Sequence, residues 1–138
     1  MKKVTLCIAW MLFILSCSFR AEGQNFIGVH KSEIAGMLKT VNPQFKLDRN
    51  AINHTYKYLK FVDKISEQTI LFFLSDKDEC TYVRWMADYA NINDLTGMLN
   101  QNYRKNGINS WSYSDKGGDY AVTLVEEEWY FTISFRKN

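Results

Sequence analysis

Nucleophilic catalysis is the first chemistry to test in this chain of 138 residues. Cys80 is the one cysteine outside the N-terminal segment, and His30 and His54 are the only imidazoles that could serve it as a base. Neither histidine has a sequence context that places it beside Cys80. The stretch CTYVRW, which begins at Cys80, alternates like a strand, and free cysteines are commonly buried. We therefore expect no enzyme activity, with a hydrolase using Cys80 and His54 as a distant alternative.

Cation binding is the second chemistry. The stretch SDKDEC contains Asp76, Asp78 and Glu79, and calcium prefers several carboxylate oxygens from a short loop. It lacks the glycine and the distant glutamate of an EF-hand, and Lys77 lies among the carboxylates. Asp and Ser also favour turns, so a hairpin turn is the preferred interpretation. We predict no metal and no cofactor, and we read residues 126–128 as a second hairpin tip that could receive a basic partner.

Aromatic residues suggest a binding surface. The C-terminal stretch WYFTISFR alternates strictly, so Trp129, Phe131, Ile133 and Phe135 should share the core face, which leaves Tyr130 on the opposite face. Neighbouring strands would add further aromatic residues to that opposite face, namely Tyr56, Tyr58 and Tyr113, with Trp111 or Tyr82 extending it. Tyr and Trp are enriched in protein interfaces, although they are also ordinary strand residues. We hypothesise that this face contacts a partner protein or a second copy of the chain.

Two similar segments, EIAGML at residues 33–38 and DLTGML at residues 94–99, indicate the secondary structure that positions the candidate residues described above. Apolar residues recur at helical spacing in both, as Ile34, Met37, Leu38 and Val41, and as Leu95, Met98, Leu99 and Tyr103. The sequence after each segment has the pattern of β-strands. We predict strands at residues 55–62, 69–74 and 80–87, and again at residues 109–113, 120–125 and 129–136.

The predicted fold is α+β: a mostly antiparallel sheet of about six strands with two helices on one face. It would be built from two helix-then-three-strands units, a pseudo-repeat at residues 32–89 and 92–136. Gly36 and Gly97 occupy the same place in the two helices, which predicts a close approach to the sheet. The stretch TILFFL at residues 69–74 does not alternate, which favours a central strand covered on both faces.

The N-terminal segment predicts export. Lys2 and Lys3 precede an apolar run at residues 4–19 and a small-residue site ending at Gly23, as in a secretory signal. We expect residues 1–23 to be removed, leaving residues 24–138 as one domain in the periplasm or on the cell surface. In an alternative interpretation ILSC is a lipoprotein signal, and only lipidation of Cys17 would attach the protein to a membrane. Removal of the signal lowers the formal charge from +2 to zero, which argues against nucleic acid as a partner.

The signal, LFFLSDKDEC in mid-chain and EEEWYFTISFRKN at the end together resemble a group of small exported proteins of the Bacteroidetes type. That resemblance implies no activity and transfers no catalytic residue. The helix-plus-strands duplication is similar in outline to the beta-lactamase inhibitory proteins, which inhibit an enzyme through a sheet face, but a fold does not imply a function. We expect an exported, non-catalytic binding or interaction module of the cell envelope, with a small-ligand or cation-binding periplasmic protein as the alternative.

Overall fold

A computed structural model describes residues 25–49 and 57–138 of the chain. The first part contains helix α2 (Lys31–Val41) and strand β1 (Lys46–Leu47). The remaining elements follow in the order β2 (Tyr58–Asp63), β3 (Gln68–Leu74), β4 (Cys80–Ala87), the short 3-10 helix η1 (Tyr89–Asn91), α3 (Ile92–Asn102), β5 (Arg104–Gly107), β6 (Ser110–Asp115), β7 (Gly118–Glu126) and β8 (Phe131–Lys137). None of the described helices has the length and apolar character that crossing a bilayer requires.

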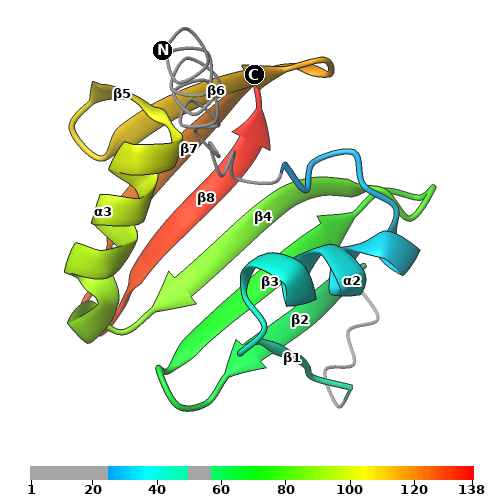
Figure 1. Cartoon of the computed structure of the whole chain (residues 1–138), viewed down its shortest axis with the longest axis horizontal. Coiled ribbons are helices and arrows are strands. Elements are labelled where there is room, and N and C mark those ends of the chain that lie inside the picture. The colour runs from blue at the N-terminus through cyan, green and yellow to red at the C-terminus, as the bar shows by residue number, and fades with distance from the viewer. Residues whose placement is uncertain (1–24, 50–56) are drawn as a thin grey trace, which may run out of the picture.

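The strands form one antiparallel sheet in the order β1-β2-β3-β4-β8-β7-β6-β5, with β4 and β8 paired at its centre (Figure 1). Both helices lie on the same face: α2 crosses the half that contains β2 and β3, and α3 crosses the half that ends in β5 (Figure 1). The α+β class is therefore present. The predicted arrangement inside that class needs correction.

Eight strands replace the predicted six, and each helix is followed by four strands, so the predicted helix-then-three-strands unit is wrong. The prediction missed the two edge strands of the sheet. β1 has only two residues, and β5 has the sequence RKNG, whose residues are all exposed. Short polar strands of this kind protect sheet edges and carry neither alternation nor β-branched residues.

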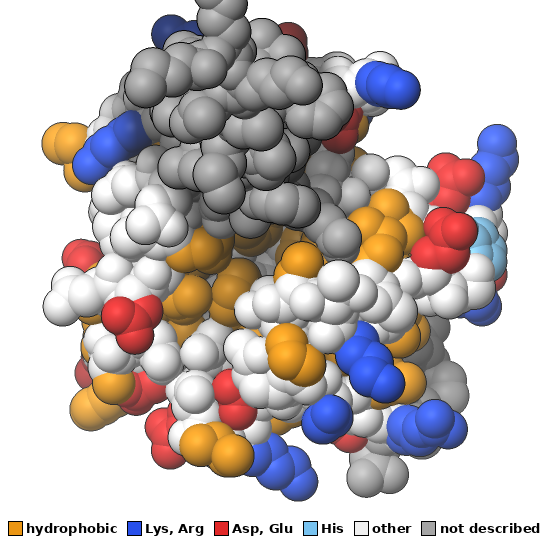
Figure 2. All heavy atoms as spheres, in the orientation of Figure 1, with side chains coloured by type: hydrophobic (Ala, Val, Ile, Leu, Met, Phe, Trp, Pro, Cys, Tyr) orange, Lys and Arg blue, Asp and Glu red, His pale blue; other side chains and the backbone are white. Residues whose placement is uncertain are grey.

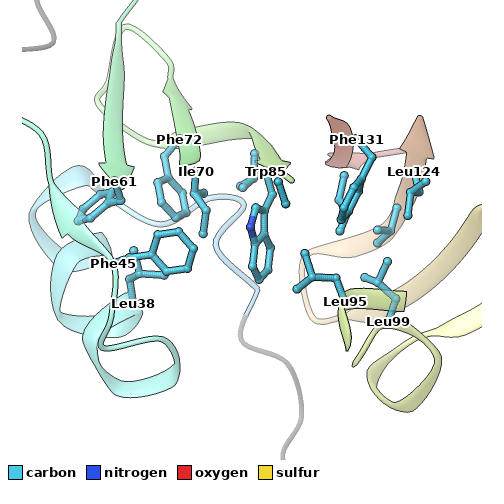
Figure 3. Packing of buried hydrophobic residues seen from close by; sticks show 14 of the residues in the cluster. Leu38, Phe45, Phe61, Ile70, Phe72, Trp85, Leu95, Leu99, Leu124 and Phe131 are labelled. Atoms are coloured by element: carbon cyan, nitrogen blue, oxygen red, sulfur yellow. The ribbon is translucent and has the colours of Figure 1, made fainter. Parts of the chain in front are cut away.

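Alternation along each strand divides the sheet into a helix-bearing face and an open face. Ile70, Trp85 and Ile133 lie in register across β3, β4 and β8, and all three are buried under the helices. Leu71, Arg84 and Ser134 are the next residues along these strands, so they lie on the open face and are only half-buried. Figure 3 shows the buried row running from Phe61 past Trp85 to Phe131, with Leu38 and Leu99 of the helices below it in this view.

The helices bury only the central part of the stripes that their sequences predict, because Val41 is exposed and Tyr103 follows the end of α3. Ile34 and Leu38 of α2 and Leu95 and Leu99 of α3 are buried against the sheet. The predicted close approach at the helix glycines is wrong, however. A Cβ atom added at Gly36 or Gly97 would meet nothing within 4 Å.

Candidate functional site: an apolar cavity between the helices

An apolar cavity of about 450 Å³ lies between α2 and α3 above the centre of the sheet. Figure 2 views the helix-bearing face and shows hydrophobic side chains gathered in a hollow between the helices. The lining residues are Phe26, Ile27, Leu38, Val41, Asn42, Gln44, Gln68, Ile70, Phe72, Val83, Trp85, Leu95, Met98, Asn102, Tyr103, Tyr113 and Phe135. None of these side chains is charged, so the cavity is both apolar and electrically neutral.

Strands β3 and β4 supply most of the floor of this cavity. Their inward side chains Ile70, Phe72, Val83 and Trp85 are all buried, and they belong to the hydrophobic core on which the helices pack. Trp85 stands between the α2 side and the α3 side of the core (Figure 3). Because β3 and β4 are each paired with a strand on both sides, these side chains are held by the interior of the sheet.

The floor contains one polar pair. Trp85 donates a hydrogen bond from its indole Nε1 to Oε1 of Gln68 over 2.8 Å, and both side chains are at least nine-tenths buried. Burial of an indole N–H without a partner would be costly, so Gln68 stabilises the tryptophan at the bottom of the cavity.

The β6 side of the cavity is aromatic. The rings of Tyr103 and Tyr113 lie 4.9 Å apart, and Tyr103 also contacts Phe135. Burial raises the pKa of Tyr103 to about 12, and burial together with the neighbouring tyrosines raises the pKa of Tyr113 further. Both phenols are therefore neutral hydrogen-bonding groups at any physiological pH.

The four tyrosines of the sequence hypothesis do not come together on one face. Tyr113 lies on the helix-bearing face and lines the cavity, and Trp111 is buried on that same face, so their expected place on the open face is corrected. Tyr113 donates from its hydroxyl to Oδ1 of Asn25, on the segment before α2. Tyr56 lies outside the described residues. Only Tyr58 and Tyr130 remain for the open side of the sheet.

Tyr58 belongs to a strip of three aromatic rings on the open face. Its ring centroid lies 5.9 Å from that of Phe73, which in turn lies 5.5 Å from that of Tyr82. The strip arises because the three residues are in register across β2, β3 and β4. Tyr82 also donates from its hydroxyl to Oγ of Ser134, 2.7 Å away on β8.

Tyr130 is separate from this strip. β8 begins at Phe131, so Trp129 and Tyr130 lie in the connection after β7, where their exposed fractions are 77% and 37%. The two residues border a small hollow that also includes Thr69 and Met86. The expected inward position of Trp129 is therefore corrected as well.

Basic side chains accompany the aromatic strip on the open face. Arg136 is in register with Tyr82, Arg84 lies one row away, and Lys60 continues that row on β2. Lys60 pairs with Asp48 over 3.4 Å, whereas neither arginine forms an ion pair with a described residue. The Nε atom of Arg84 is buried and lacks a hydrogen-bond partner among the described residues.

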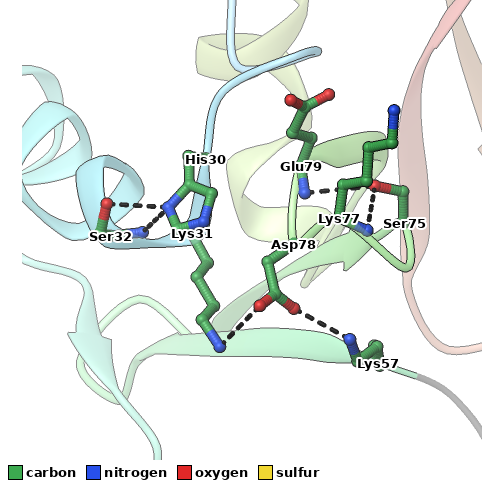
Figure 4. A network of polar contacts seen from close by, with 8 residues as sticks. All are labelled: His30, Lys31, Ser32, Lys57, Ser75, Lys77, Asp78 and Glu79. Carbon is green, nitrogen blue, oxygen red and sulfur yellow. Dashed lines mark hydrogen bonds and ion pairs between the residues drawn. The ribbon is translucent and has the colours of Figure 1, made fainter.

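The acidic stretch forms the turn between β3 and β4. The two oxygens of Asp78 each lie 3.0 Å from a lysine ammonium group, one from Lys31 at the start of α2 and one from Lys57 before β2 (Figure 4). Hydrogen bonds from these lysines, Lys31 foremost, lower the pKa of Asp78. The described residues hold no group of three acidic, His or Cys side chains placed to share a metal ion. The turn thus ties the first helix to the sheet.

The Cys80 thiol is buried in the core, with 1% of the residue exposed. Burial raises the pKa of this thiol to about 11, so it is protonated at neutral pH. His54, its hypothetical base, lies outside the described residues. His30 is the N-cap of α2 and accepts a hydrogen bond at Nδ1 from the backbone N–H of Ser32 (Figure 4).

Comparisons of this chain with protein-family models, with curated proteins and with solved structures find no match. The resemblance to exported proteins of the Bacteroidetes type therefore stays a prediction. The cavity residues were missed at the sequence level, because Gln68, Trp85 and Met98 read as ordinary strand and helix positions. Only the packing of distant segments reveals that they face a common space.

Proposed function

We propose that this protein is a non-catalytic binding protein that takes an uncharged, apolar small molecule into the cavity between α2 and α3. The cavity itself carries this proposal. Its volume of about 450 Å³ is within the range of roughly 300 to 1,000 Å³ that is usual for ligand sites. An apolar lining with a few fixed polar groups on a rigid floor is the usual composition of such sites.

The absence of charge from the lining supports an uncharged ligand. Moving an ion out of water into such an environment is strongly unfavourable unless an opposite charge or several hydrogen bonds compensate it. The cavity lining offers no such charge. A non-catalytic function is supported by the state of Cys80, because a buried thiol with a raised pKa is a poor nucleophile.

The proposal is tested with an uncharged fluorescent probe, N-phenyl-1-naphthylamine, whose emission rises in apolar surroundings. Met98→Trp would fill part of the cavity from α3, and we expect probe affinity to fall at least about tenfold. Met37→Trp is the matched control, because Met37 is equally half-buried on α2 but does not line the cavity. Equal probe binding by both variants and the original protein would exclude the cavity as the site.

We further propose that the protein acts outside the cytoplasm, as the secretory signal in residues 1–23 suggests. Mass spectrometry of protein from the cell envelope would test this. A mature chain starting near Gln24 supports a soluble exported form, and an acylated N-terminus at Cys17 supports a membrane-attached form. A chain that keeps Met1 and stays in the cytoplasm would refute both.

A second candidate function is protein binding through the open face of the sheet. The aromatic strip of Tyr58, Phe73 and Tyr82 lies beside two arginines that lack ion-pair partners among the described residues. Tyr and Arg are the residue types that most often dominate binding interfaces. This composition favours an acidic protein segment over a second copy of the chain.

Charge reversal at neighbouring positions tests the second candidate. Arg136→Glu changes the open face, whereas Lys137→Glu makes the same change of charge at the next residue, which points to the other face. We expect retention on immobilised polyglutamate to weaken with rising salt and to be lost only in the first variant. Equal retention of the two variants would refute the open face as an acidic-segment site.

A further inference from the structure

Gln68 is the one deeply buried polar side chain that lines the cavity. It is the first residue of β3, it is in register with Asp63 on β2 and Ala87 on β4, and only 8% of it is exposed. Glutamine is usually exposed, because its amide group loses hydrogen bonds to water when it is buried. Its place in the cavity wall therefore needs a partner for each of its polar atoms.

The tryptophan beside it fixes the orientation of the Gln68 amide. An indole N–H can only donate a hydrogen bond, so the atom that faces Trp85 Nε1 at 2.8 Å must be the amide oxygen. The amide nitrogen, Nε2, consequently points elsewhere. It makes no hydrogen bond to any described residue.

This nitrogen keeps access to the cavity. The fully enclosed side-chain atoms that lack partners in the described part of the chain are Arg84 Nε and Thr132 Oγ1, and Gln68 Nε2 is not among them. Gln68 lines the cavity, so an occupant of that space can reach this amide nitrogen. The floor thus presents the oriented NH2 group of one amide as a hydrogen-bond donor.

We propose that the cavity ligand is an uncharged, elongated lipid-like molecule with a carbonyl oxygen, such as an ester or a ketone, that accepts a hydrogen bond from Gln68 Nε2. This inference rests on the proposed function and gives its ligand a chemical class. A pure hydrocarbon would leave the donor without a partner, and a carboxylate would enter a site that has no cation. A neutral carbonyl compound avoids both penalties.

The positions of the polar groups support an elongated shape. Gln68 is in register with Ala87, whereas Phe135, against which Tyr103 packs, is in register with Val83. These two rows are four residues apart along β4, which corresponds to about 13 Å at roughly 3.3 Å per residue. An extended chain can therefore have its carbonyl group at Gln68 and its apolar end towards the tyrosines.

Three probes of matched size test the inference by displacement of N-phenyl-1-naphthylamine from the purified protein. Methyl decanoate has the neutral carbonyl group, tridecane lacks any acceptor, and decanoate has a charged one. We expect methyl decanoate to bind at least about tenfold more tightly than either of the others. Equal displacement by methyl decanoate and tridecane would overturn the inference and leave the cavity proposal intact. Failure of every apolar probe to bind would remove the proposed function itself.

Variants of Gln68 identify the donor. Gln68→Met keeps the approximate volume and removes the N–H, so the preference for methyl decanoate over tridecane should collapse to near unity. If the methionine variant does not fold, the comparison of methyl decanoate with tridecane on the original protein still decides the inference. Gln101→Met is the control, because Gln101 is an exposed residue of α3 that does not line the cavity, and this variant should retain the preference. A preference that survives the substitution of Gln68 would refute its role.

Discussion

The buried thiol of Cys80 makes the stability of the fold depend on alkaline pH in a way that can be calculated. Burial raises the pKa of this thiol from its ordinary value of about 9 to about 11. Below pH 9 the folded and unfolded chains both keep the proton, so the full stability is present. Above pH 9 the unfolded chain loses the proton first, and the free energy of unfolding falls until the folded thiol also ionises near pH 11.

The magnitude follows from the size of the shift. A difference of about two pKa units between the folded and unfolded chains lowers the free energy of unfolding by roughly 1 kcal/mol at pH 10 and roughly 2 kcal/mol at pH 11. Urea unfolding under reducing conditions at pH 8, 10 and 11 measures this loss. Tyr103 and Tyr113 also have raised pKa values, so their ionisation lowers the free energy of unfolding at alkaline pH in the same direction. The contribution of Cys80 is therefore isolated by measuring the same pH dependence in the variant Cys80→Ala.

The alanine variant removes the thiol titration and keeps the two tyrosines. Its smaller side chain lowers stability by a pH-independent amount, which cancels when only the change with pH is compared. We expect the original protein to lose about 2 kcal/mol more than the variant between pH 8 and pH 11. Parallel losses in the two proteins would show that Cys80 is not buried in the folded state.

Three further predictions concern packing and backbone geometry, and urea unfolding measures each of them. Gly36→Ala and Gly97→Ala should each stabilise the protein by about 0.5 to 1 kcal/mol, because the added methyl groups meet nothing; destabilisation would restore the idea of close approach. Leu99→Ala should cost about 2 to 5 kcal/mol, since this side chain is fully buried, and a loss under 1 kcal/mol would contradict its place in the core. Gly118→Ala should destabilise the start of β7, because φ at Gly118, its first residue, is +128° and the new Cβ would lie 3.2 Å from Lys137; an unchanged midpoint would contradict that backbone conformation.

Local periodicity predicted the elements that have one strongly apolar side. The helical stripe through Ile34 and Leu38 is buried as expected, and so are Phe131 and Ile133 of the alternating C-terminal strand. The same pattern extended the last strand too far, because alternation alone does not tell Trp129 in a connection from a residue in a strand. The edge strands gave no signal to detect, because β1 has only two residues and β5 has no apolar side chain.

The stretch TILFFL was informative in a different way from the one expected. It lacks alternation, but Ile70 and Phe72 are buried under the helices, whereas Leu71 and Phe73 are only half-buried on the open face. Its second apolar side is therefore part of an aromatic surface, over which residues 25–49 and 57–138 place no further layer. The tyrosine hypothesis failed at Tyr113 because the face of a residue depends on the register of its strand, and a shift of one residue reverses it.

The cavity could not be predicted from sequence for a related reason. Trp85 and Gln68 are 17 positions apart on neighbouring strands, and α3 brings Met98 towards them from further along the chain. The free space exists because each helix packs on its own half of the sheet and leaves the middle uncovered. Such a gap is a property of tertiary packing and has no local pattern.

The strand order has a consequence for how the protein matures. The last strand of the chain, β8, occupies the centre of the sheet and pairs with β4 across sequence separations such as that between Ala87 and Phe131. During synthesis, the inner edge of β4 stays unpaired until β8 has been made. Long-range pairing of this kind slows folding and exposes a strand edge that can aggregate. A chaperone that binds the unfolded chain would therefore protect this protein more than a protein in which each strand pairs with the one before it.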